Sequence, residues 1–102
     1  MKRVKRRYLA LQFECQTMPT EREFIDAIWN AVTKLYGEVG ASQTGLSLIS
    51  LDAEQKVAII RVSLAMLDKT RASLATVISI TGNEAAIHVL AVSGTLKSLR
   101  KK

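Results

Sequence analysis

The sequence predicts an α+β fold in which two helices cover one face of a four-stranded antiparallel sheet. Three observations predict it: four short apolar runs typical of strands, two longer stretches with helical spacing, and the order in which they alternate along 102 residues. That order is β-α-β-β-α-β, followed by a short basic helix at the C-terminus. It is the frame of ferredoxin-like and RNA-recognition-motif-like sandwiches. Right-handed crossovers then favour the strand order 4-1-3-2.

The first strand is predicted by strict alternation. In residues 8–15, apolar side chains occupy every second position, which is typical of a half-buried strand. Its last residue is the only cysteine, so no internal disulfide is possible and an intracellular setting is favoured. We interpret this thiol as a small core residue rather than a nucleophile. The predicted core face consists of Leu9, Leu11, Phe13 and Cys15.

The first helix is predicted by a capping pattern at its start and by a stripe of apolar residues along one side. Pro19 breaks the chain, and Thr20 with Glu23 forms a capping-box pattern. We expect the helix to run to about Tyr36, because Gly37 is suited to end it. Its apolar residues form a stripe broad enough to pack on a sheet: Phe24, Ile25, Ile28, Trp29, Val32, Leu35 and Tyr36.

The middle of the chain is predicted to form a hairpin. Residues 37–45 carry three glycines and are typical of a loop. The apolar runs 46–51 and 57–62 are separated by the polar turn 52–55, so we expect them to pair as neighbouring strands.

The last third repeats the pattern of helix and strand. We expect a second helix from Leu64 to Ile80, stopped by Gly82 and Asn83, and a fourth strand over 85–92. The terminal basic helix follows. Nothing in the chain suggests a linker, so we expect residues 1–102 to form one domain. The expected core residues of the second helix are Leu67, Leu74, Val77 and Ile78.

Positive charge is concentrated at the two ends. The formal net charge of +6 divides into +9 on residues 1–7 and 97–102 and −3 on the rest, which has six basic and nine acidic side chains. In the predicted strand order both ends emerge at one corner, which favours a polyanionic partner, most often nucleic acid. Solvated, frayed ends are the alternative. The basic residues of the ends are Lys2, Arg3, Lys5, Arg6, Arg7, Lys97, Arg100, Lys101 and Lys102.

Further candidate RNA contacts lie between the ends. Ser93 or Thr95 can cap the terminal helix and leave its first amides for a phosphate, and Gly94 allows close backbone approach. An ordinary cap hydrated by water fits these residues equally well. Three other basic residues are candidates of the same kind, although they also suit a solvated surface: Arg61, Lys69 and Arg71.

The residues argue against an enzyme that acts alone. The only histidine, His88, lies within a predicted strand, and one histidine with one cysteine cannot form a common zinc site. No nucleotide-binding glycine motif is present. We therefore expect no catalytic residue, no metal and no cofactor bound by the protein. No apolar run is long enough to span a bilayer, and we expect a cytoplasmic protein with no membrane partner.

Aromatic residues decide how RNA is expected to bind. RNA-recognition motifs stack bases on aromatic residues of the first and third strands. Here the third strand has none, and the first has only Tyr8 near its start. Binding through phosphates and shape is therefore favoured over base stacking. The aromatic residues of the first helix are typical of a core, although one of Phe24, Trp29 and Tyr36 is free to serve a protein partner.

The chain resembles the ribonuclease P protein component 2 family of archaea and eukaryotes, and its length favours an archaeal member. The most distinctive matching segments are AIIRVS, LDKTRASLA and VSGTLK, and the resemblance covers nearly the whole chain. It implies a protein subunit of ribonuclease P, which removes the 5′ leader from precursor tRNA. It also implies that the RNA carries the catalysis with magnesium ions. The implied partners are the catalytic domain of that RNA, protein component 3 and, through the complex, precursor tRNA. A homodimer within a larger assembly stays open. At His88 the family is expected to carry a basic residue, which puts an RNA contact there in doubt.

Two other classes of function compete with this interpretation. A small-ligand-binding regulatory module on a ferredoxin-like fold would bind a ligand without RNA. An acylphosphatase-like hydrolase would need an arginine cradle after the first strand, where this chain reads CQTMPT.

Overall fold

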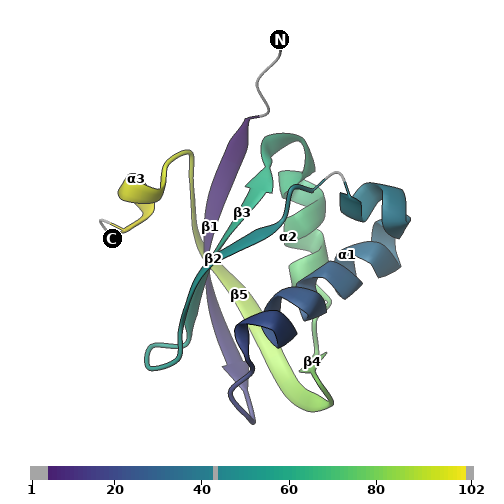
Figure 1. Ribbon diagram of the computed structural model, residues 1–102, viewed down its shortest axis with the longest axis vertical. Coiled ribbons are helices and arrows are strands. Elements are labelled where there is room, and N and C mark those ends of the chain that lie inside the picture. Colours follow the sequence, from purple (N-terminus) through teal and green to yellow (C-terminus); the bar gives the residue numbers. More distant parts are fainter. Residues whose placement is uncertain (1–4, 43, 101–102) are drawn as a thin grey trace.

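A computed structural model describes residues 5–42 and 44–100 as an antiparallel sheet with two helices packed on one face (Figure 1). The prediction of an α+β fold is thus confirmed. The elements in chain order are β1 (Arg6–Cys15), α1 (Glu21–Ser42), β2 (Ser47–Asp52), β3 (Val57–Ser63), the 3-10 turn η1 (Leu64–Met66), α2 (Leu67–Ala75), β4 (Ser79–Ile80), β5 (Asn83–Ser93) and α3 (Leu96–Arg100).

The sheet has five strands in the order β2-β3-β1-β5-β4, so the predicted four-stranded sheet is not matched exactly. The four longer strands keep the expected relative order, and the short strand β4 is added at one edge. Residues 79–80 were expected to end a helix, but they pair with the start of β5 across a turn in which Thr81 and Gly82 have φ values of 49° and 82°. Two positive φ values are typical of a type I′ hairpin, which suits the twist of paired strands. The second helix is therefore shorter than predicted.

The core lies between the sheet and the two helices. The alternation predicted for β1 is confirmed, because Leu9, Leu11 and Phe13 are buried while Gln12 and Glu14 are exposed. The ring of Phe13 lies 5.0 Å from that of Phe24 on α1, which joins strand and helix. Cys15, which was predicted on the core face, is half-buried and packs against this core.

Helix α1 begins as predicted and continues further. Glu23 N–H donates to Thr20 Oγ1 at 3.1 Å and Thr20 N–H donates to Glu23 Oε1 at 2.8 Å, a complete capping box. The helix breaks at Gly37, whose φ of 76° suits glycine, but helical turns resume to Ser42. The prediction of a loop from residue 37 onward is therefore wrong, and burial of Ala41 in the core explains the extension.

Some apolar residues expected in the core are exposed. On α1 the inner stripe is narrower than predicted. Ile78 is 76% exposed, so its predicted core position is wrong, whereas Leu74 and Val77 are buried and Leu67 packs partly on the core. The residues of the predicted α1 stripe that lie exposed are Trp29, Leu35 and Tyr36.

The short helix α3 lies on the face of the sheet opposite α1 and α2 (Figure 1). We call this the open face. Helix α3 packs against β1 and β5, and its Leu99 is buried there. One end of the open face is therefore covered by the C-terminal segment.

Candidate nucleic-acid interface

The described parts of the two basic ends meet at one end of the sheet. Tyr8 on β1 is the register partner of Ser93 on β5, so the start of one strand adjoins the end of the other. The end of β3 joins them, since Leu64 N–H donates to the Lys5 carbonyl at 2.8 Å. We call this region the basic end, and its basic residues are Lys5, Arg6, Arg7, Lys69, Arg71 and Lys97.

Arg7 connects the first strand to the turn that precedes α3. A Cβ on Gly94 would lie 3.6 Å from Arg7 Nη1, so the guanidinium rests against the backbone at Gly94. The same nitrogen donates to the Arg6 carbonyl at 2.9 Å. Ser93 Oγ accepts the Thr95 N–H at 3.2 Å, which shapes the turn. The Ser93–Thr95 turn and the first strand therefore form one surface, as the sequence predicted.

Arg61 lies on the open face in a row across four strands. Its register partners are Tyr8 on β1 and Ser47 on β2, and Tyr8 in turn faces Ser93. The Nε of Arg61 is buried and, within the described residues, has no hydrogen-bond partner. The row thus extends the basic end onto the open face.

Lys69 and Arg71 belong to the first half of α2, in the helix layer. Both are exposed on α2, which follows η1 at the end of β3. The Lys69 ammonium lies 5.5 Å from the centroid of the Tyr36 ring, a cation–π contact. Among the described residues, the ion pair that forms is Arg22–Asp26 at 3.7 Å on α1, and none forms at the basic end.

Four predicted RNA contacts lie outside the described residues: Lys2, Arg3, Lys101 and Lys102. Arg100 ends α3, and only its place in that helix is described. His88 is exposed on the open face opposite Gln12, away from the row that contains Arg61.

Sequence reasoning missed that acidic residues gather at the other end of the sheet. Glu14 is the next-to-last residue of β1 and Glu84 is the second residue of β5, while Asp52 ends β2 and Glu54 lies in the β2–β3 turn. Residues 21 and 23, both glutamates, begin α1 at the same end (Figure 1). The signal was available in the sequence, since each of these acids stands near a strand end, in a turn or at a helix start. We call this region the acidic end.

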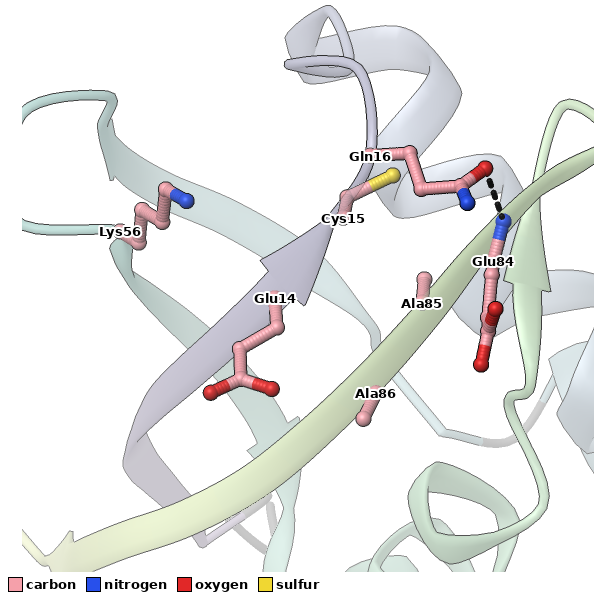
Figure 2. A pocket seen from close by; sticks show the side chains of 7 residues that line it. All are labelled: Glu14, Cys15, Gln16, Lys56, Glu84, Ala85 and Ala86. Atoms are coloured by element: carbon pink, nitrogen blue, oxygen red, sulfur yellow. Dashed lines mark hydrogen bonds between the residues drawn. The ribbon is translucent and has the colours of Figure 1, made fainter.

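A cavity of about 410 Å³ lies at the acidic end, beside the end of β1 and the start of β5 (Figure 2). Its lining mixes the carboxylates of Glu14 and Glu84 with the ammonium of Lys56 and the thiol of Cys15. Gln16 Oε1 accepts the Glu84 N–H at 3.4 Å and fixes one wall. Within the described part of the chain, no three histidine, cysteine, aspartate or glutamate side chains converge as metal ligands would. Among the described helices, none is both long and apolar enough to cross a membrane.

Comparison with known proteins assigns the chain to a family. The sequence pattern of the Rpp14/Pop5 family matches residues 7–102. The chain belongs to the Rpp14/Pop5 family. This agrees with the resemblance found in the sequence.

Among relatives of this Rpp14/Pop5 protein, ribonuclease P protein component 2 of Pyrococcus furiosus is 37% identical over 98% of this chain and 83% of its own length. The protein of the same name from Methanosarcina mazei is 32% identical over 98% of this chain and 84% of its own length. A chain in the cryo-EM structure of yeast ribonuclease MRP has the same fold, with a TM-score of 0.73 at 22% identity over 94% of this chain and 79% of that one.

Proposed function

We propose that this chain is a noncatalytic RNA-binding subunit of ribonuclease P, which helps the catalytic RNA to remove the 5′ leader from precursor tRNA. The observation that carries the proposal is the basic end, where cations from β1, α2 and the segment after β5 converge without acidic partners among the described residues. The names of the archaeal relatives support the choice of complex.

The basic end acts on the RNA by neutralising phosphate. Folded RNA brings phosphate groups of different helices close together, and their repulsion limits packing. Each lysine or arginine that replaces condensed counterions releases them, which favours binding and makes affinity depend on salt. Backbone contacts of this kind position the protein without reading sequence, which fits a sheet face with few aromatic residues.

The remaining parts of the proposal concern the assembly. The protein binds the catalytic domain of the RNA beside protein component 3, and it meets precursor tRNA only through the complex. Magnesium ions belong to the RNA, where they serve catalysis, and this chain holds no cofactor. We place the complex in the cytoplasm. The size of the reconstituted particle will show whether the assembly contains one copy of this chain or a homodimer.

Reconstitution tests the proposal. Ribonuclease P RNA and the other protein subunits are assembled with and without this chain, and cleavage of precursor tRNA is measured at limiting magnesium. Omission should lower the rate strongly at low magnesium and weakly at high magnesium, because magnesium also screens phosphate. An unchanged rate at low magnesium would refute the proposed function.

A further inference from the structure

Arg7 and Gly94 lie opposite each other at the basic end. Tyr8 is the register partner of Ser93, and one further step along both segments sets Arg7 beside Gly94. Residues that face each other on antiparallel strands project to the same side of the sheet, with Cβ atoms about 5 Å apart. A glycine opposite an arginine therefore leaves the arginine room to lie across the neighbouring backbone.

The guanidinium of Arg7 occupies that room. A Cβ on Gly94 would lie 3.6 Å from Arg7 Nη1 and 3.8 Å from Arg7 Cζ. The same Nη1 donates to the Arg6 carbonyl at 2.9 Å. Arg7 is half-buried, whereas Arg6 is exposed. The orientation of the Arg7 guanidinium is thus held both by a hydrogen bond and by contact with the backbone at Gly94.

The backbone conformation at residue 94 does not require glycine. Gly37, Gly45 and Gly82 have positive φ values, but Gly94 does not, so its φ is open to other residues. A Cβ alone would meet Arg7 at an ordinary van der Waals distance. A larger side chain would extend into the guanidinium. The missing side chain at Gly94 therefore matters for the position of Arg7 rather than for the turn.

The turn that carries Gly94 is fixed on both sides. Before it, Ser93 pairs with Tyr8. After it, Leu99 is buried, and its N–H donates to the Thr95 carbonyl at 3.3 Å. Gly94 therefore cannot move away from a bulky substituent without disturbing the strand pairing or the packing of α3, and the Arg7 side chain would move first.

We propose that Gly94 is a positioning residue, which holds the Arg7 guanidinium ready to bind one RNA phosphate through two N–H groups. A planar guanidinium matches two phosphate oxygens in this way. Because it carries several N–H donors, the hydrogen bond to Arg6 leaves donors for a phosphate. Among the described residues, no carboxylate forms an ion pair with Arg7. This inference rests on the proposed function, since RNA supplies the phosphate.

The test measures affinity of the full chain for ribonuclease P RNA by filter binding over a salt series. Gly94→Val should weaken binding about tenfold, because valine places two methyl groups on Cβ beside the guanidinium. The salt slope should change little, since the charge of Arg7 remains. Arg7→Lys should do the same, because it keeps the charge but loses the planar fork. Arg7→Gln should lower both affinity and slope, and Gly94→Ala should lose less affinity than Gly94→Val.

A double variant separates positioning from a structural effect. Gly94→Val combined with Arg7→Gln should bind RNA within about twofold of Arg7→Gln alone, because Gly94 acts through Arg7. A structural defect from valine would instead add to the loss. The matched control is Ala86→Val, which also introduces valine but lies on β5 at the acidic end. It should change RNA affinity less than about twofold, and thermal melting of each variant checks its folding.

The outcomes distinguish this inference from the proposed function. The inference is overturned if Gly94→Val binds RNA as well as the unaltered chain does, or if the losses from Gly94→Val and Arg7→Gln add in the double variant. Either result, with RNA still bound by the unaltered chain, leaves the proposed function intact. If the unaltered chain does not bind ribonuclease P RNA, the proposed function is itself wrong.

Discussion

The two ends of the sheet carry opposite charge, but they use it differently. At the acidic end, carboxylates bond to the protein's own backbone. Glu23 completes the capping box with Thr20, and Asp52 Oδ1 accepts the N–H groups of Glu54 and Gln55 at 3.0 and 3.1 Å. At the basic end, no ion pair forms within the described residues.

This difference indicates which charges serve folding and which serve a partner. Acids at a helix start or a turn stabilise local structure, because backbone N–H groups there lack other acceptors. Cations gathered without ion pairs among the described residues repel one another and oppose compaction. The repulsion among these basic side chains lowers the stability of the fold, and a bound polyanion would offset that loss.

The largest expected effect comes from reversing charge at the basic end. The triple variant Lys5→Glu, Arg6→Glu, Arg7→Glu should weaken binding to ribonuclease P RNA on the order of 100-fold at moderate salt. The slope of log affinity against log salt should become shallower by about two to three, because each lost phosphate contact removes about 0.7–0.9. Filter binding over a salt series measures both. Lys56→Glu, an exposed lysine at the acidic end, is the matched control. If Lys56→Glu weakened RNA binding as much as the triple variant, the claim that RNA binds only the basic end would be wrong.

An intermediate effect is expected from the capping box at the acidic end. Thr20→Ala should lower the free energy of unfolding by about 1 kcal/mol, since it leaves the Glu23 N–H without its acceptor. Urea denaturation measures the loss. RNA affinity of the folded variant should stay unchanged, because this end is not expected to contact RNA. Weaker RNA binding without lower stability would contradict a purely structural role.

The smallest effect is expected from the acidic cavity. The double variant Glu14→Gln, Glu84→Gln removes two carboxylates that line it. The molecule measures 44 Å along its longest axis, whereas the Debye length is about 8 Å at physiological ionic strength. RNA affinity should therefore rise less than about twofold. Titration at two salt concentrations checks this, and a larger rise would mean that RNA also approaches the acidic end.

The sequence predicted most of the fold because its signals are local. Alternation placed β1, and the Thr20–Glu23 pattern placed the start of α1. The missed strand β4 also had a local signal, since Thr81-Gly82 follows β-branched residues and suits a tight hairpin. Helical spacing of Leu74, Val77 and Ile78 outweighed that signal in the prediction. The lesson is that apolar spacing alone does not distinguish a helix end from a short strand.

The candidate site was predicted in part. The predicted strand order placed the start of the first strand beside the end of the last one, and the structure confirms this. The contact between Arg7 and Gly94 that results was not predicted. The side of the sheet covered by α3 did not follow from sequence. A five-residue helix with two leucines carries too little pattern to choose a face, and burial of Leu99 decides it.

The sequence by itself determined the alternating strands, the start of α1, the charge on the two ends and the family. These depend on residue identity and on spacing over a few positions. Only the tertiary structure decided that Ile78 and Leu35 lie exposed beside one groove, that acids collect opposite the basic end, and that α3 covers one end of the open face. Each of these depends on which distant segment covers a residue, and that is settled by packing the whole chain around one core.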